Sequence, residues 1–179
     1  RPHGPASDPF ALLLDVGATV ACTGDDLVTF AAMGAAYAAK ISRLERPRVA
    51  LLSNGAGTSG APPRIRDAHR QLQLATPGFE YIGCLRADHV TSGDADVVVT
   101  DGFTGDVLLR TLEGIAATGE LLIKRAAEKF QWRLGVQMLG DGIAAIREFT
   151  DWENYGGAPL LGVDRAVIVT QANSGRRAF

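Results

Sequence analysis

Residues 95–105 read Ala-Asp-Val-Val-Val-Thr-Asp-Gly-Phe-Thr-Gly. The run from Ala95 to Thr100 is short and nearly all valine, which is typical of a strand covered on both faces. A long helical pattern begins directly after Gly105. A buried strand that passes through a glycine turn into a helix is the repeating unit of parallel sheets. This stretch therefore predicts an α/β fold.

The same alternation of strand and helix continues on both sides of that stretch. Asp25 and Asp26 are placed to cap a helix that ends near Leu44. A second helix is predicted over residues 65–74, after a pair of prolines. Further strands are predicted over residues 10–16, 49–52, 79–85 and 166–170. We expect a mostly parallel sheet with flanking helices.

A helical pattern extends over residues 106–149, with interruptions near residues 132–135 and around Gly140. These interruptions predict a protruding pair of antiparallel helices joined at a tip. Residues 1–9 contain three prolines and a glycine, which is typical of a linker. We expect a single α/β domain over residues 10–179.

Composition narrows the functional classes. The formal net charge of −2 and the isoelectric point near 5.9 give no general attraction to nucleic acid. Cys22 and Cys84 have no Cys-x-x-Cys spacing and no secretory leader precedes them, which favours a reducing cytoplasm without disulfides or a metal site. No apolar run approaches the roughly 20 residues of a membrane span.

The glycine turn after the valine strand is the first candidate site. Backbone N–H groups and the positive end of the following helix converge there, so the turn would attract an anion. A glycine turn that joins a strand to a helix can equally be structural, without any ligand. The candidate catalytic residues are Asp101, Gly102, Thr104 and Gly105.

A second glycine-rich stretch occupies residues 155–163. Gly156, Gly157 and Pro159 are too close together for a regular helix or strand, which implies a special backbone path. Residues Tyr155 to Pro159, including Ala158, are candidates for shaping a substrate pocket.

Glycines at 55, 57 and 60 also satisfy the G-x-G-x-x-G dinucleotide fingerprint, with Glu80 as the acid that would bind the ribose. Pro62 and Pro63 crowd the start of the following helix and argue against it. A NAD-dependent dehydrogenase is therefore the third interpretation, and we expect no cofactor.

The predicted tip mixes basic and apolar side chains, among them Phe130, Trp132 and Leu134. Such a mixture can lie in a membrane interface. A dimer contact, or a helix face that closes on the core, explains the same residues and is slightly favoured by them alone.

Several motifs together resemble the phosphate acyltransferases of bacterial phospholipid synthesis. They match in order and spacing, and they cover residues 10–179, roughly the second half of such an enzyme. The motifs are Leu14-Asp15-Val16-Gly17-Ala18, Met33-Gly34 with Tyr37-Ala38, Pro47-Arg48-Val49, residues 95–99, residues 101–105 and residues 155–163.

The resemblance implies a two-lobed fold like that of isocitrate and isopropylmalate dehydrogenases and a homodimer. With the cytoplasmic location that the cysteines favour, a lipid-binding tip would place the enzyme at the inner face of the membrane. It also implies the reaction: phosphate attacks the thioester of an acyl carrier protein and acyl phosphate is formed, without an enzyme nucleophile or cofactor. Asp15 and Gly17 would then join residues 155–159 in binding substrate.

This chain departs from the family pattern mainly at polar positions. Thr19 and Asp106 each stand where the family has asparagine, and Arg86 and Asp88 replace glutamate and arginine. Residues 53–63 replace an acidic stretch followed by Lys-Gly-Asn. Near the end, Gln171, Asn173 and Ser174 fall in a segment that replaces His-Gly-Ser-Ser-Asn and so lacks its imidazole.

These departures leave two functional hypotheses. One is a divergent acyltransferase of lipid metabolism that acts on a carrier-protein thioester. The other is a non-catalytic member of the family that keeps the dimer and the carrier-protein surface. Asp106 would repel a bound phosphate by about 1 kcal/mol at contact range, unless a cation such as Arg110 intervenes.

Overall fold

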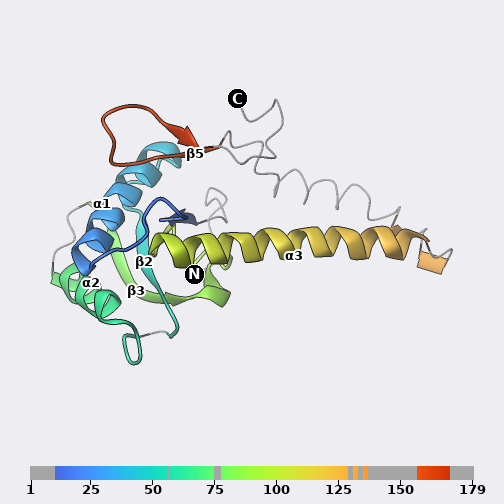
Figure 1. Cartoon of the computed structure of the whole chain (residues 1–179), viewed down its shortest axis with the longest axis horizontal. Coiled ribbons are helices and arrows are strands. Elements are labelled where there is room, and N and C mark those ends of the chain that lie inside the picture. The colour runs from blue at the N-terminus through green and yellow to red at the C-terminus, as the bar shows by residue number, and fades with distance from the viewer. Residues whose placement is uncertain are drawn as a thin grey trace. The chain divides into compact units, whose positions relative to one another are not determined.

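The computed structural model describes residues 11–55, 57–74, 78–128, 131–132, 135–136 and 157–169 (Figure 1). The chain divides into two compact units, residues 1–110 and 111–179. The strands of the first unit are β1 (Leu12–Leu14), β2 (Arg48–Ser53), β3 (Glu80–Arg86) and β4 (Val97–Val99). Its helices are α1 (Gly24–Ile41), α2 (Pro63–Leu74), the short 3-10 helix η1 (Ala87–His89) and the start of α3 (Gly102–Glu128).

The four strands of the first unit form one sheet in the order β1-β4-β2-β3, and every neighbouring pair is parallel. The valine strand β4 lies inside the sheet between β1 and β2, and its three valines are fully buried. The predicted α/β class with a mostly parallel sheet is therefore confirmed. Burial on both faces explains why these strands read as continuous apolar runs.

Helices α1 and α2, blue and green in Figure 1, pack against each other and against the sheet. Their apolar faces enclose a core with Val49 and Leu51 of β2 and Val97 of β4. A Cβ added to Gly34 would lie 2.7 Å from Val97 Cγ1, so α1 approaches β4 closely only because residue 34 is glycine. Ala50, Leu52 and Val98 face a second core that includes Leu108 of α3.

Strands β1 and β4 are shorter than predicted and α2 begins two residues earlier, and three further differences concern α1 and α3. Thr23, rather than Asp25 or Asp26, is the N-cap of α1, and Thr23 and Asp26 form a reciprocal capping box. The helix ends at Ile41. The third difference is that α3 already begins at Gly102, so the predicted glycine turn is the first turn of a helix.

The second unit contains most of α3 and a small antiparallel sheet. Strand β5 (Ala158–Pro159) pairs with β6 (Ile168–Val169). The strand predicted over residues 166–170 begins later than expected, because residues 166 and 167 are not in a strand, and residue 170 lies outside the described residues. α3 is 27 residues long, and residues 131–132 and 135–136 are also helical. The predicted second helix of the pair, which was expected to end near residue 149, falls mostly on residues 137–149, outside the described residues. Within the described ranges, no helix is both long and apolar enough to span a membrane.

Candidate functional site

Polar residues follow three neighbouring strands of the sheet where each strand ends. Asp15 follows β1, Thr100 and Asp101 follow β4, and Asn54 follows β2. Because the strands are parallel, these residues lie at one edge of the sheet, which we call the carboxyl edge. In open α/β sheets, ligands bind at this edge.

The loop after β1 is folded around the carboxylate of Asp15, which is only 4% exposed. Its Oδ1 accepts a hydrogen bond from the Ala18 N–H at 2.9 Å. Its Oδ2 accepts from the Thr19 N–H at 2.8 Å and from the Thr19 hydroxyl at 2.7 Å. Gly17 has φ +115°, a backbone conformation that favours glycine. The loop is thus held in one shape by a buried carboxylate.

The start of α3 presses directly on this loop. A Cβ at Gly105 would overlap the carbonyl oxygen of Asp15, and one at Gly102 would overlap the carbonyl oxygen of Thr19. Both glycines are therefore required by close backbone approach, whether or not a ligand binds here. The candidate residues Asp15, Gly102 and Gly105 are brought together, as the anion-site hypothesis needs.

Asp101 caps α3 with its own side chain. Its Oδ1 accepts from the Thr104 N–H at 3.0 Å, and its Oδ2 accepts from the Thr104 hydroxyl at 2.8 Å and from Arg64 Nη2 at 2.8 Å. Burial alone would raise the pKa of Asp101, but these hydrogen bonds outweigh burial and lower it. The carboxylate is therefore ionised at the positive end of the helix.

This cap limits the predicted anion site. The Thr104 amide is used by the Asp101 side chain, and the Gly105 amide donates to the Asp101 carbonyl oxygen at 2.9 Å. Of the donors predicted in this turn, the described contacts leave the amides of Gly102 and Phe103 for a ligand. Phe103 itself is 73% exposed at the helix start.

Asp106, one of the positions that depart from the family pattern, has a cation beside it. Arg110 Nε lies 3.3 Å from Asp106 Oδ1, one helical turn further along α3. Both side chains are about half exposed, so the pair is partly screened by solvent. Arg110 can therefore offset the negative charge of Asp106, which would otherwise repel a phosphate bound nearby.

Comparison with known proteins now identifies the family. The family described as fatty acid synthesis protein matches residues 2–179. The chain belongs to this family.

Its relatives within the family include proteins named phosphate acyltransferase. That of Campylobacter jejuni (strain RM1221) is 39% identical over 169 residues, which cover 94% of this chain and 51% of the relative. That of Myxococcus xanthus is 39% identical over 171 residues, which cover 94% of this chain and 48% of the relative. That of Helicobacter pylori (strain J99) is 37% identical over 169 residues, which cover 94% of this chain and 49% of the relative. The chain thus spans about half the length of the curated relatives it matches.

Membership of the fatty acid synthesis protein family does not favour the dinucleotide interpretation, and the geometry also opposes it. Glu80 begins β3 and pairs in register with Arg48 at the start of β2. Gly55, Gly57 and Gly60 follow the end of β2. The acid and the glycines are therefore at opposite edges of the sheet, and Glu80 is wrongly placed to bind the ribose of a nucleotide at this loop.

The second glycine-rich stretch belongs to the unit of residues 111–179. Gly157 and Gly162 have φ values of +89° and +81°, as a special backbone path requires. The prediction that no strand passes through this stretch is wrong at Ala158 and Pro159, which form the short strand β5. Leu160 N–H donates to the Val167 carbonyl oxygen at 2.9 Å, next to the β5–β6 pair. Other predicted site residues lie outside the described residues: Tyr155, Gly156, Gln171, Asn173 and Ser174.

Two of the three tip residues, Phe130 and Leu134, are likewise outside the described residues, whereas Trp132 is described and 59% exposed. The exposed indole is compatible with a membrane contact or a dimer contact, whereas a helix face that closes on the core would bury it. No group of side chains suited to holding a metal ion occurs among the described residues.

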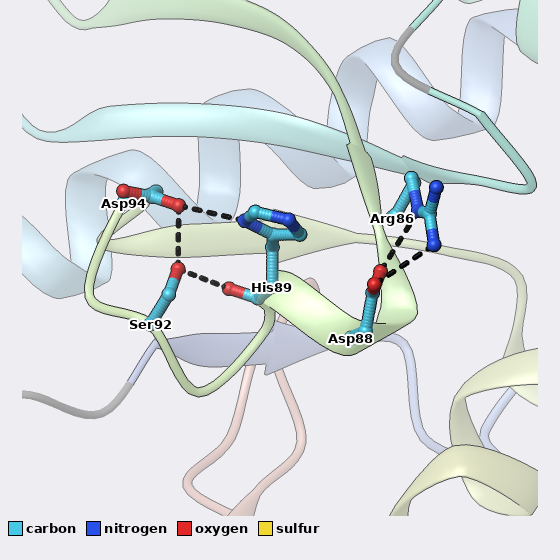
Figure 2. Close-up of polar contacts among 5 residues, drawn as sticks. All are labelled: Arg86, Asp88, His89, Ser92 and Asp94. Atoms are coloured by element: carbon cyan, nitrogen blue, oxygen red, sulfur yellow. Dashed lines mark hydrogen bonds and ion pairs between the residues drawn. The ribbon is translucent and has the colours of Figure 1, made fainter.

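The β3–β4 connection explains two of the departures from the family pattern (Figure 2). Arg86 Nε donates to Asp88 Oδ1 at 2.9 Å, and Arg86 Nη2 donates to Asp88 Oδ2 at 2.8 Å. The hydrogen bonds from Arg86 lower the pKa of Asp88. The resemblance implies glutamate and arginine at these two positions, where this chain has an arginine and an aspartate that form an ion pair.

The same connection carries a histidine, a serine and an aspartate that do not form a catalytic triad. In Figure 2, the Ser92 hydroxyl lies 2.5 Å from Asp94 Oδ2 and 2.6 Å from the His89 carbonyl oxygen, and its one hydrogen is shared between these two acceptors. The His89 ring contacts Asp94 rather than the serine, with Nδ1 3.2 Å from Oδ2. A catalytic triad requires the imidazole to contact the nucleophile. This cluster instead holds the loop of residues 89–94 together through hydrogen bonds.

Sequence reasoning missed one residue of the carboxyl edge, Arg64. It comes from α2 and contacts Asp101, which is 37 positions later in the chain. Residues 64–74 read as an ordinary amphipathic helix, and nothing local distinguishes Arg64 from Arg66 or Arg70. Only the topology of the sheet, which places β4 beside β2, could have pointed to the contact.

Proposed function

We propose that the whole protein transfers an acyl group from the thioester of an acyl carrier protein to inorganic phosphate. A phosphate oxygen attacks the thioester carbonyl, the carbon–sulfur bond breaks, and the products are acyl phosphate and the carrier thiol. The proposal is supported by the family and by relatives named phosphate acyltransferase. Because the chain spans about half of those relatives, the reaction is assigned to the whole protein.

No enzyme nucleophile is required for this reaction, since phosphate is itself the nucleophile. The protein must instead orient the phosphate and stabilise the developing oxyanion with donors that are already in place. The amides of Gly102 and Phe103 are the donors that we assign to this task. Asp101 fixes them by capping α3, and the Thr104 hydroxyl holds the Asp101 carboxylate in turn.

The family match, with relatives named phosphate acyltransferase, is the observation that carries the proposed reaction. The contact between the Asp15 loop and the first turn of α3 supports the place that we propose for the site. Gly102 and Gly105 lie so close to the carbonyl oxygens of Thr19 and Asp15 that no side chain would fit at either glycine. We assign Asp15 and Gly17 to the wall of the substrate site, and the stretch from Tyr155 to Pro159 to the pocket that receives the acyl chain.

The remaining assignments follow from the same proposal. The domain of residues 10–179 would be half of a two-lobed, homodimeric, cytoplasmic enzyme. Phe130, Trp132 and Leu134 would form either the dimer contact or a peripheral contact with the inner membrane face. Gln171, Asn173 and Ser174 would carry the polar contacts that an imidazole supplies in the family.

The test uses the whole protein with acyl carrier protein thioesters of several chain lengths and with phosphate. Acyl phosphate is measured after trapping with hydroxylamine, and release of the carrier thiol is measured in parallel. We expect both products to appear in equal amounts and only when phosphate is present. If neither product forms with any carrier protein tested, the proposal is wrong and the non-catalytic interpretation replaces it.

A further inference from the structure

Arg64 brings a positive charge to the carboxyl edge. It is the second residue of α2, and its Nη2 donates to Asp101 Oδ2 at 2.8 Å, so it links the start of α2 to the first turn of α3. The connection of residues 54–62 contains no lysine or arginine, so Arg64 is the first cation after β2. Of the nearby arginines, Arg66 donates to the Ala61 carbonyl oxygen at 3.0 Å, and Arg86 and Arg110 are paired with Asp88 and Asp106.

The guanidinium of Arg64 is only partly used by this contact. Its Nε is buried and has no hydrogen-bond partner within the described part of the chain. The side chain is 37% exposed, so solvent reaches it away from Nε. A guanidinium has five N–H donors, and a buried donor without a partner is rare in folded proteins. Because Nε is enclosed, the donors that Arg64 can offer to a ligand are the N–H groups in the exposed part of its guanidinium.

Asp101 does not depend on Arg64 alone. The amide and the hydroxyl of Thr104 both donate to its carboxylate, and the N-terminus of α3 stabilises its charge. If the guanidinium turned partly toward a ligand, Asp101 would keep these partners. The Arg64–Asp101 contact can therefore be shared with a second anion without leaving a buried carboxylate unpaired.

We propose that Arg64 binds a phosphate oxyanion at the carboxyl edge, with two N–H groups that donate to two oxygens. This inference rests on the proposed function, which brings phosphate chemistry to this edge. The planar fork of arginine suits two oxygens of one phosphate, whereas lysine offers only a point charge. The oxyanion is either free phosphate or the phosphate ester in the phosphopantetheine arm of a carrier protein.

Binding of each source is measured separately on the whole protein. Inorganic phosphate and phosphopantetheine are titrated by calorimetry against the parent protein, Arg64→Lys and Arg64→Gln. The matched control is Arg70→Gln, which removes the same charge from the same helix at a 73% exposed side chain. In parallel, the Arg64 Nε–H signal, assigned by its loss in Arg64→Lys, is followed by NMR in the parent during both titrations.

We expect Arg64→Lys to weaken binding of one of the two probes by about tenfold or more, as loss of a charge-assisted hydrogen bond implies. The Nε–H signal should shift with that same probe, which identifies the source of the oxyanion. Arg70→Gln should bind both probes like the parent. Unchanged binding of both probes by Arg64→Lys, or a signal that neither probe shifts, would overturn the inference.

The outcome is separable from that of the proposed function. A protein that binds phosphate through Arg64 but makes no acyl phosphate keeps this inference and loses the proposed reaction. A protein that makes acyl phosphate, with KM values for phosphate and for acyl carrier protein unchanged in Arg64→Lys, keeps the reaction and loses the inference. Arg64→Lys retains a positive charge beside Asp101, so thermal unfolding of this variant serves as the check on folding.

Discussion

The Cα of Gly105 lies against the carbonyl oxygen of Asp15, so closely that a methyl group on Gly105 would overlap that oxygen. The two residues are 90 positions apart in sequence, and the contact joins the loop after β1 to the first turn of α3. It is a backbone contact, which cannot be relieved by turning a flexible side chain.

Gly105→Ala should therefore destabilise the protein. The added methyl must push the Asp15 loop or α3 aside, and such overpacking typically costs about 1 to 3 kcal/mol. The free energy of unfolding in urea measures the effect. Gly114→Ala is the matched control in the same helix, because no atom lies within 4 Å of its added Cβ. It should stabilise the helix by about 0.5 to 1 kcal/mol. Equal effects at the two positions would contradict the close contact.

The ion pair between Arg48 and Asp96 should matter more than a surface pair. Arg48 Nη2 and Nε donate to the two carboxylate oxygens at 2.7 and 3.1 Å, and the Arg48 backbone N–H donates to Oδ2 at 2.7 Å. The Asp96 side chain is only 13% exposed, and Asp96→Ala removes the acceptor of all three hydrogen bonds. This variant should lower the free energy of unfolding by about 2 kcal/mol or more.

Asp67→Ala provides the control for that measurement, since it breaks the exposed Arg70–Asp67 pair on α2. Exposed pairs contribute about 0 to 1 kcal/mol, so this variant should unfold nearly like the parent in urea. The prediction fails if Asp96→Ala and Asp67→Ala lower the free energy of unfolding by the same amount.

The Asp101 cap on α3 should make the stability of the folded protein depend on pH in the acidic range. The pKa of Asp101 is lowered in the folded protein, so its ionised form favours folding. That contribution is complete above the ordinary carboxyl pKa of about 3.9 and is lost as the pH falls through the lower folded value. Asp101→Asn should therefore be less stable than the parent near neutrality, and the difference should shrink below about pH 4.

Thr104→Val tests the cause of that acid dependence. It removes the hydroxyl donor but keeps the backbone N–H donor, so the pH-dependent loss of stability should be smaller than in the parent and larger than in Asp101→Asn. Urea unfolding at several pH values measures all three proteins. A parent and an Asp101→Asn variant with parallel pH profiles would show that the Asp101 carboxylate is not stabilised in this way.

The ion pair between Arg86 and Asp88 predicts an effect on the pKa of Asp88. The pKa of Asp88 is lowered chiefly by the hydrogen bonds from Arg86. In Arg86→Gln the pKa of Asp88, followed by carbon-detected NMR titration, should rise toward the ordinary carboxyl value. The double variant Arg86→Glu with Asp88→Arg should restore an ion pair. An unchanged Asp88 titration in Arg86→Gln would contradict the assignment.

Hydrophobic pattern was sufficient to predict the sheet. Val97 to Val99 and the core of β2 read as short apolar runs because both faces of a central parallel strand are buried. The start of α3 was predicted too late, because two glycines in four residues normally weaken a helix. Here they are required by contacts with Asp15 and Thr19, and a contact over that sequence distance leaves no local signal.

The candidate site was predicted in part for the same reason. Asp15 and the Asp101 turn could be placed together because parallel strands end at one edge. Arg64 could not be placed, since its role depends on which strand lies beside which. The acid expected at Glu80 was placed by residue spacing alone, and the register of β3 put it at the other edge.

The continuity of α3 has a practical consequence for anyone who wishes to study the two compact units separately. The boundary between them falls between Arg110 and Thr111, inside a helix that runs from Gly102 to Glu128. A cut at that boundary would leave the Asp101 cap on a segment of only nine helical residues, from Gly102 to Arg110, which is too short to persist as an isolated helix in water. Segmental isotope labelling of the intact polypeptide is therefore a better route to spectra of either unit than truncation.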